Sequence, residues 1–423
     1  MTPMRETSLP RSAAIDPAMV ERDLRTLIRI PSITGSEDAV QLAVKELLAG
    51  AGLQTQRIDA DPTAIAADPD FPGSEMPRTT LPVVTGRIGR PGGRRILLVG
   101  HVDVVPPGDL ATWSTDPWSA EIRDGAMYGR GTCDMKGGVV AIIAALRALV
   151  ASGAADRLGG EVLAVSVPSE EDGGQGMLAA IRAGCTGDVA VITEPTRLDV
   201  VIAHAGAITF RLTVPGRAAH ASKRREGVSA LDNLFTLTRA LTADETARNG
   251  AETDPLMTVL GLPYPTIIGT VAGGDWASTV LDRVVAEGRY GVRLGQTWRE
   301  AEVELRACIS AACAADPFLR EHPATVGITG GRFSSSRVAA DHPLPVSLSA
   351  AMTATLGRTP EFRGEPYGAD MRLLVNEGNT PTVIFGPGDV RHAHSADEHV
   401  PLAEVVECAR VLAAWVEREL AAG

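Results

Sequence analysis

Hydrophobic residues in the first half of the chain form short unbroken runs, separated by segments in which they recur every three or four positions. The runs at 96–99 and 189–192, and the segment 162–167, in which only Ser166 is polar, are typical of strands buried on both faces and predict strands at 95–99, 162–167 and 189–192. Helical spacing is found in the segments 135–152 and 175–183. This alternation predicts an α/β fold whose mainly parallel sheet is sandwiched between helices.

Further elements surround this unit. An amphipathic helix at 17–29 is expected to end at Pro31, and Ser36 is a candidate N-cap for a second helix at 37–50. The remaining predicted strands of this half are 53–59, 82–88 and 198–204. The segments 60–80 and 105–126 are expected to be loops.

The helix predicted at 135–152 contains Gly137-Gly138, a pair that lowers helix propensity. Small residues allow a helix to come unusually close to its neighbours. We therefore expect this helix start to approach a neighbouring backbone or a ligand.

The pattern changes after residue 205 to strand, helix, strand, strand, helix and strand. The predicted ranges are 207–214, 226–245, 265–272, 283–293, 298–314 and 324–328. This βαββαβ order predicts an inserted α+β, ferredoxin-like domain at 206–332, with hinges at Ala205-Gly206 and Gly330-Gly331. The α/β pattern then returns in the segments 344–356, 360–363, 369–376, 381–385 and 402–421. The larger domain would thus comprise 1–205 and 333–423.

Composition narrows the class of protein. The 423 residues suffice for two or three domains, and the net charge of −12 argues against nucleic acid or an anionic membrane as a partner. No apolar run reaches transmembrane length, and the N-terminus lacks the apolar core of a secretory signal. The five cysteines are odd in number and contain no CxxC pair, which favours reduced thiols and a cytoplasmic location.

His101 and Asp103 directly follow the buried strand at 95–99. Ligands of open α/β sheets bind at the carboxyl ends of strands. A metal-binding histidine usually needs a carboxylate or a carbonyl at its second ring nitrogen. His101 is therefore a candidate metal ligand, and Asp103 is the candidate that orients it.

Other metal-ligand residue types are predicted at the same rim. Most follow predicted strands, and Asp134 begins the third helix; they are Asp134, Glu170, Glu171, Glu194 and His394. With His101 they are too many for one catalytic zinc, but they suit two metal ions about 3.5–4 Å apart that share one carboxylate. Asp134 is the natural bridge, and such donors suit zinc, with cobalt or manganese as substitutes.

Each candidate also has an ordinary structural explanation. Asp134 could be a helix N-cap, residues 170–172 a solvated acidic turn, and residues 391–399 a histidine-rich surface loop. What favours the metal site is that so many candidates converge on one sheet edge.

Five motifs, in order along nearly the whole chain, resemble a known family. They are GHVDVVP at 100–106, MYGRGTCDMKGG at 127–138, SEED at 169–172, TEP at 193–195 and FGPGD…AHSADE at 385–398. They are similar to the co-catalytic metallohydrolases that include aminoacylase, bacterial glutamate carboxypeptidase, acetylornithine deacetylase and succinyl-diaminopimelate desuccinylase.

The resemblance implies specific roles. His101 and Glu194 would bind one metal, Glu171 and His394 the other, with Asp134 bridging the two. Glu170 would be the general base, Asp103 would support His101, and a cis peptide would follow Asp134. The residues with a role in this site would therefore be His101, Asp103, Asp134, Glu170, Glu171, Glu194 and His394.

The resemblance also assigns the inserted domain as a lid and homodimerisation domain. His220, in GRAAHAS at 216–222, would reach the partner's site and stabilise the oxyanion. Arg293 would bind a substrate carboxylate, with Gly273, Gly274 and Ser278 as further substrate contacts.

Two departures from the family pattern affect this lid. Ser278 stands where the family usually has Asn, and Leu281 where it has Pro. In addition, Lys223-Arg224-Arg225 replaces the proline that usually follows the lid histidine. These changes leave the metal chemistry intact and point to altered substrate contacts.

The expected function is dinuclear metal-dependent hydrolysis of an amide in a small N-acyl amino acid that bears a carboxylate. A dipeptidase or carboxypeptidase is the alternative within hydrolases, and a non-catalytic metal-binding homologue is the alternative outside them. Lys136 is followed by Gly, so no P-loop is present, and no GxSxG motif marks a serine hydrolase.

Overall fold

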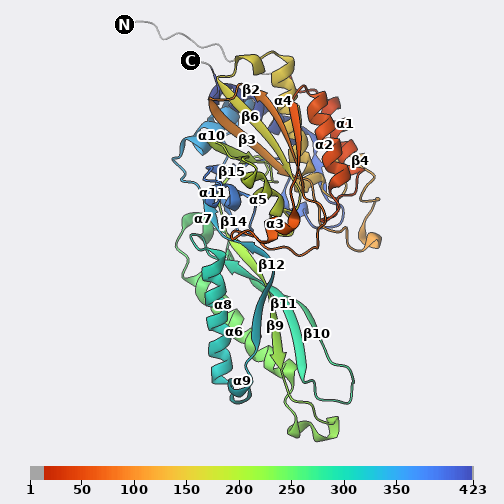
Figure 1. Cartoon of the computed structure of the whole chain (residues 1–423), viewed down its shortest axis with the longest axis vertical. Helices are drawn as coiled ribbons and strands as arrows, with labels where there is room; N and C mark the ends of the chain where they lie inside the picture. The colour runs from red at the N-terminus through yellow and green to blue at the C-terminus, as the bar shows by residue number, and fades with distance from the viewer. Residues whose placement is uncertain (1–13, 422–423) are drawn as a thin grey trace.

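The computed structural model describes residues 14–421. The molecule is elongated and has a larger part built around a wide sheet and a narrower part with its own sheet (Figure 1). No helix within 14–421 combines the length and the apolar character needed to cross a membrane.

The wide sheet has nine strands, in the order β1-β2-β6-β3-β7-β15-β8-β13, with β14 also paired to β8. Their bounds are β1 Gln54–Asp59, β2 Pro82–Gly89, β3 Arg94–His101, β6 Gly160–Val167, β7 Val189–Ile192, β8 Val200–His204, β13 Ser336–Arg337, β14 Phe362–Glu365 and β15 Thr382–Ile384. The α/β fold class is confirmed. The central strands β6, β3, β7 and β15 are parallel, but β1 pairs antiparallel with β2, β2 with β6, and β8 with both β15 and β13, so the sheet is mixed.

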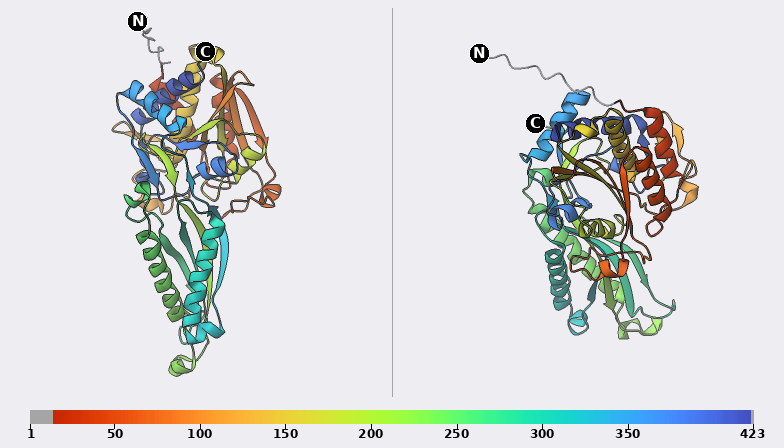
Figure 2. Two further views of the ribbon diagram at one scale, coloured as in Figure 1. Left: turned by 90° about the vertical axis from the view of Figure 1, so that its left-hand side faces the viewer. Right: turned by 45° about the horizontal axis from the view of Figure 1, so that its top comes forward.

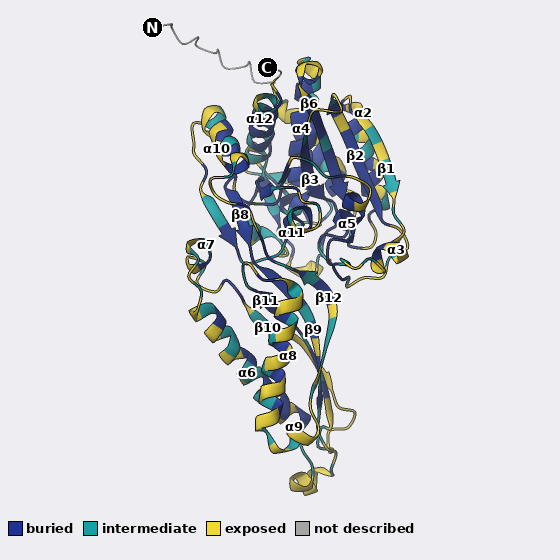
Figure 3. Cartoon of the chain, turned by 60° about the vertical axis from the view of Figure 1, so that its left-hand side comes forward, coloured by how far each residue is buried: buried dark blue, intermediate teal, exposed yellow. Residues whose placement is uncertain are grey.

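Helices cover both faces of this sheet, as predicted. One face packs on α1 Pro17–Ile28, α2 Asp38–Gly50, α4 Gly137–Ala151, α10 Pro343–Leu356 and α12 Leu402–Glu419. The other packs on α3 Pro62–Ala66, α5 Gln175–Arg182 and α11 Met371–Asn376. Successive residues of β3 point to opposite cores, with Ile96 and Leu98 in one and Leu97 and Val99 in the other. The strand is therefore buried on both faces, which is why its sequence reads as an unbroken apolar run (Figure 3).

Three local expectations differ from the structure. Helix α2 begins after Glu37, and no side chain caps it, so the prediction of Ser36 as N-cap is wrong. The segment 60–80 contains the short helix α3. The segment 105–126 leads into a hairpin of β4 Glu121–Arg123 and β5 Ala126–Tyr128, to which β16 His399–Pro401 adds a third strand.

The second sheet has the predicted βαββαβ order. Its elements are β9 Gly206–Pro215, α6 Ala230–Gly250, β10 Thr266–Gly273, β11 Arg283–Val292, α8 Trp298–Ala315 and β12 Thr325–Phe333, with the short helices α7 Pro255–Thr258 and α9 Pro317–Glu321. The antiparallel strands lie in the order β10-β11-β9-β12. Helices α6 and α8 cover one face (Figure 2, left), and no helix among the described residues covers the other. Because these four strands pair with one another and with no other described strand, we treat 206–332 as a separate lid domain.

Helix α4 begins close to the backbone that follows β7. A side chain at Gly138 would place its Cβ 2.1 Å from the carbonyl oxygen of Thr193, the residue before Glu194. The expectation of a close backbone approach at this glycine pair is confirmed. The contact fixes the start of α4, and with it the preceding segment that contains Asp134, against the rim of the sheet.

We expect Gly138→Ala to lower the free energy of unfolding by about 1–3 kcal/mol or more, because the new methyl group has no room. Urea denaturation followed by circular dichroism measures this. Gly50→Ala at the end of α2 is the matched control, since its Cβ would meet nothing within 4 Å. Gly50→Ala should be neutral or slightly stabilising. Equal effects at the two sites would contradict the packing argument.

Candidate metal centre

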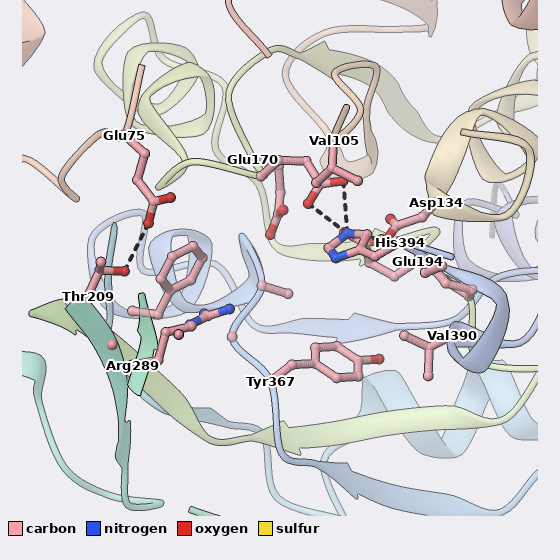
Figure 4. A pocket seen from close by; sticks show the side chains of 18 of the residues that line it. Glu75, Val105, Asp134, Glu170, Glu194, Thr209, Arg289, Tyr367, Val390 and His394 are labelled. Carbon is pink, nitrogen blue, oxygen red and sulfur yellow. Dashed lines mark hydrogen bonds and ion pairs between the residues drawn. The ribbon is translucent and has the colours of Figure 1, made fainter. Parts of the chain in front are cut away.

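The structure brings the predicted metal ligands together at the carboxyl rim of the wide sheet. His101 ends β3, Glu170 and Glu171 follow β6, and Glu194 follows β7. Asp134 lies in the irregular turn that precedes α4, and His394 lies in the loop after β15. All six side chains except that of His101 line one cavity (Figure 4).

Asp134 occupies the centre of this cluster. Its Oδ1 lies 3.1 Å from Nε2 of His101, and its Oδ2 lies 3.5 Å from Nε2 of His394. Each histidine has a glutamate of its own: Nε2 of His101 is 3.6 Å from Glu194, and Nε2 of His394 is 3.0 Å from Glu171. One carboxylate thus faces two separate His–Glu pairs.

The donor set fits divalent cations. Ligand atoms of His101, Glu170 and Glu194 lie within 4.8 Å of one another, and so do those of His101, Asp134 and Glu171. Imidazole nitrogen and carboxylate oxygen are the ligand types of zinc, cobalt and manganese sites. A carboxylate shared between two His–Glu pairs is the arrangement expected of a two-metal centre.

The electrostatics of the cluster also favour bound cations. Burial raises the pKa of Glu194 to about 8, with the charge of His101 opposing this shift. Burial, and then the nearby Glu194, raise the pKa of Glu170 well above its usual range. Hydrogen bonds to Asp134 and then Glu171 raise the pKa of His394 to about 11. Buried carboxylates this close together repel one another unless positive charge balances them.

Backbone contacts hold Asp134 in place. The Glu398 carboxylate accepts hydrogen bonds from the backbone N–H groups of Cys133 and Asp134, at 3.0 and 3.1 Å. Its other oxygen accepts from Arg130 at 2.6 Å, and both side chains are buried. The peptide bond between Asp134 and Met135 is cis, as the resemblance implied. Arg130 and Glu398 both lie inside the motifs that resemble the family, but the sequence did not indicate that they hold the backbone of Asp134.

Asp103 contacts His101 through its backbone carbonyl, one of the two kinds of group expected at this ring nitrogen. The Nδ1 of His101 is 2.9 Å from the backbone oxygen of Asp103, whereas the Asp103 carboxylate is 3.6 Å away. That carboxylate accepts the backbone N–H groups of Glu170 and Glu171 instead, at 3.1 and 3.2 Å. It therefore anchors the acidic turn. The carbonyl contact favours the tautomer that leaves Nε2 of His101 free to bind metal.

The cavity has a volume of about 590 Å³ and lies between the metal-ligand cluster and the lid. The lid contributes Thr209, Gly269, Thr270, Glu287, Gly288 and Arg289. Tyr367 and Glu75 line it from the larger domain, and the buried hydroxyl of Tyr367 has no hydrogen-bond partner within residues 14–421. Sequence reasoning missed Arg289, Tyr367 and Glu75, because no motif marks them.

The predicted lid residues lie elsewhere in this chain. His220 is exposed, and the loop that carries it lies at the end of the lid farthest from the wide sheet (Figure 1). Ser278 is beside it, since its carbonyl accepts the N–H of Ala221 at 2.9 Å. Gly273 ends β10, and Gly274 follows in the turn that leads to Ser278. None of these residues lines the cavity.

Arg293 is also apart from the metal-ligand cluster. Its guanidinium pairs with Glu304 of α8, and it borders a different surface hollow together with Arg248 and Glu252. The structure therefore separates the predicted carboxylate-binding arginine from the cavity that contains the predicted ligands.

Removing the Asp103 carboxylate should loosen the acidic turn. We expect Asp103→Ala to weaken metal binding by about 10- to 100-fold, the usual effect of losing a group that orients metal ligands. Metal content after dialysis against a chelator, measured by mass spectrometry, checks this. Asp103→Asn, which keeps one accepting oxygen, should lose less, and exposed Asp109→Ala should lose nothing. Equal metal retention in all three variants would contradict the anchoring role.

Comparison with known proteins places the chain in a family. A family model described as peptidase family M20/M25/M40 matches residues 97–418. Succinyl-diaminopimelate desuccinylase of Methylobacterium nodulans is 30% identical over 393 residues, which cover 90% of each chain.

Solved structures share the fold. The M20 family metallo-carboxypeptidase Sso-CP2 from Sulfolobus solfataricus aligns with a TM-score of 0.72 at 16% identity, covering 94% of this chain and 98% of that one. The YXEP protein of Bacillus subtilis, a dinuclear metal-binding M20 peptidase, aligns with a TM-score of 0.62 at 14% identity, covering 96% and 98%. The family resemblance of the motifs is thus confirmed. The chain belongs to peptidase family M20/M25/M40 and is a hydrolase of amide bonds.

Proposed function

We propose that the protein hydrolyses the amide bond of a small N-acyl amino acid with two divalent metal ions, zinc in the first place and cobalt or manganese as substitutes. The observation that carries this proposal is the position of Asp134, whose two oxygens face two histidines, each with its own glutamate. His101 and Glu194 would hold one ion, Glu171 and His394 the other, with Asp134 shared. Ions in these positions would supply Lewis-acid chemistry for the substrate carbonyl and for water.

Glu170 is the proposed general base. It lines the cavity next to the proposed ligand Glu171, and its backbone N–H is held by Asp103. Its carboxylate would take a proton from the attacking water and pass it to the leaving nitrogen.

We propose further that the protein acts as a homodimer through its lid, with His220 serving the site of the second copy. His220 is exposed, and its Nδ1 lies 2.9 Å from the Ser222 hydroxyl, which leaves Nε2 available. In its own chain it does not line the cavity, so a role at the reacting carbonyl requires another copy. The substitutions at Ser278 and Leu281 lie in the same part of the lid and would affect this contact.

The substrate side of the proposal favours a deacylase. The relative from Methylobacterium nodulans is named a succinyl-diaminopimelate desuccinylase. A dipeptidase or carboxypeptidase is the second candidate, since the structurally similar Sso-CP2 is a carboxypeptidase. Five free cysteines agree with a cytoplasmic location.

A substrate panel tests the reaction. We expect the metal-loaded enzyme to hydrolyse N-acetyl- or N-succinyl-amino acids faster than dipeptides. We expect Glu170→Gln to lower kcat by at least about 10²- to 10⁴-fold with unchanged metal content, because the proton acceptor is lost. Release of the free amino acid, followed by chromatography, measures both.

The same panel separates the alternatives. Faster cleavage of dipeptides would replace the deacylase with a peptidase. Undiminished turnover in Glu170→Gln would refute the assigned base. Absence of turnover on every substrate, with metal bound, would favour a non-catalytic homologue.

Mixing two inactive variants tests the dimer. In a mixed dimer of Glu170→Gln and His220→Ala, one of the two sites receives both an intact Glu170 and an intact His220. If subunits exchange randomly, activity should recover to about a quarter of wild type, because half of the dimers are mixed and each has one complete site. Kinetics before and after subunit exchange measure this. Full activity of His220→Ala alone would exclude the proposed role.

A further inference from the structure

We propose that the acyl half of the substrate lies against an uncharged wall beside the metal-ligand cluster, and that the enzyme therefore selects an acetyl or another uncharged acyl group over a succinyl group. The wall, called the acyl wall below, consists of four residues that line the cavity: Pro195, Tyr367, Val390 and Ala393. This inference rests on the proposed amide hydrolysis and names the class of acyl group that the proposed function left open.

The acyl wall directly adjoins the predicted metal ligands. Pro195 follows Glu194 in the chain, and Ala393 precedes His394. The N–H of Ala393 also donates to the carbonyl of Val390 at 3.0 Å, which holds both residues in one turn. A substituent on this side of an amide bound at the cluster would therefore meet the acyl wall first.

Two chain segments and one aromatic ring build the wall. An antiparallel bridge joins Thr196 to Asp389, so that Pro195 stands opposite Val390. Tyr367 reaches this pair from the segment that follows β14, and its hydroxyl points toward Val390 (Figure 4). Residues distant in sequence thus come together as one surface.

No arginine or lysine among the described residues contributes to the acyl wall. Arg289, on the lid, is the one such side chain among the described lining residues of the cavity. Two arginines are close to the wall in sequence, Arg197 and Arg391, but both are exposed and neither lines the cavity. Their guanidinium groups approach Asp389 instead, at 3.8 and 2.5 Å.

The metal-ligand cluster would supply no surplus positive charge either. Two divalent cations would just balance the four carboxylates that line the cavity beside the wall, Asp134, Glu170, Glu171 and Glu194. On the lid, Arg211 is likewise engaged, since it pairs with Glu287 at 2.6 Å. A further carboxylate at the acyl wall would lose its water without gaining a cation, which is costly.

The Tyr367 hydroxyl suits a neutral group. It is buried, and it has no hydrogen-bond partner within residues 14–421. Burial, followed by the charges of Glu365 and Glu194, raises the pKa of this hydroxyl well above the usual range of tyrosine. It therefore stays protonated, and the acyl wall presents no ionised side chain of its own.

The proposed substrates differ in the number of charges that the cavity must accommodate. Their amino-acid half carries a carboxylate, which the acyl wall cannot neutralise, so the acyl half is the one that lies there. An acetyl group brings a methyl group to the wall, whereas a succinyl group ends in a second carboxylate. The wall therefore favours the acetyl group, although the relative from Methylobacterium nodulans is named a desuccinylase.

Three acyl groups on one amino acid test the inference. The N-acetyl, N-succinyl and N-succinamoyl forms are compared, because the succinamoyl group is as long as succinyl but ends in an uncharged amide. We expect kcat/KM for the acetyl and succinamoyl forms to exceed that for the succinyl form by at least about 10-fold, since only the succinyl form desolvates an unpaired carboxylate. Chromatography of the released amino acid measures this.

Two outcomes of this comparison would overturn the proposal. The first is fastest hydrolysis of the succinyl form. The second is equally slow hydrolysis of the succinyl and succinamoyl forms, which would show selection by length and not by charge.

A cation placed at the acyl wall should shift the preference. We expect Val390→Lys to raise the succinyl-to-acetyl ratio of kcat/KM by roughly 10-fold, because the ammonium would pair with the second carboxylate. Val346→Lys is the matched control, since Val346 is exposed on α10 and does not line the cavity. An unchanged ratio in a folded, metal-loaded Val390→Lys would refute the proposal. If this variant does not fold, the three-substrate comparison decides alone.

Binding separates this inference from the proposed reaction. Calorimetry with the same three compounds in the Glu170→Gln variant needs no turnover. Weaker binding of the succinyl form than of the other two would support the acyl wall even if the wild type hydrolysed none of them. Tighter binding and faster hydrolysis of the succinyl form would refute the acyl wall while leaving amide hydrolysis standing.

Discussion

The crowding of buried carboxylates around Asp134 is the constraint on which the rest of the structure depends. Glu171 and Glu194 approach the two histidines that Asp134 also contacts, and burial raises the pKa values of both glutamates. Such a cluster costs folding free energy unless cations balance it. Hydrogen bonds from the surrounding groups nonetheless hold the cluster together. The Glu398 carboxylate accepts the backbone N–H of Asp134, and the Asp103 carboxylate accepts the backbone N–H groups of Glu170 and Glu171 in the acidic turn. This arrangement is more readily explained by function than by stability.

The acidic turn is also connected to the lid through a single loop. Asp172, the last residue of the turn, accepts hydrogen bonds from the Ser74 hydroxyl at 2.8 Å and pairs with buried Arg78 at 3.1 Å. Two residues before Ser74, the carbonyl of Pro72 accepts the N–H of Arg332 at 2.7 Å, at the end of β12. A displacement of Arg332 at the end of β12 would therefore act, through the loop, on the residues next to Glu170. The loop at 60–80, which the sequence marks only as polar, thus contacts both domains.

The sequence predicted what depends on local pattern, and it missed what depends on pairing. Apolar runs such as 96–99 identify buried strands because both faces are covered. The candidate ligands could be found because they lie where those runs end. The antiparallel pairing at the two edges of the sheet could not be predicted in this way. An apolar run shows that a strand is buried, but not whether its neighbour runs parallel or antiparallel to it. Likewise, Asp103 was correctly placed beside His101, but the choice between its carboxylate and its carbonyl is settled by the acidic turn, which is distant in sequence.

Cross-strand register determines which lid side chains face the cavity. Every proposed metal ligand comes from the wide-sheet domain, so a substitution in the lid removes none of them. On the lid, a one-residue shift of β11 against β9 would turn Arg289 toward the helices and remove Arg211 from Glu287. Alternating burial along β11, where Val284, Ala286 and Tyr290 face the lid core, fixes this register. The charge that faces the cavity is therefore specified by the same apolar side chains that hold the lid together.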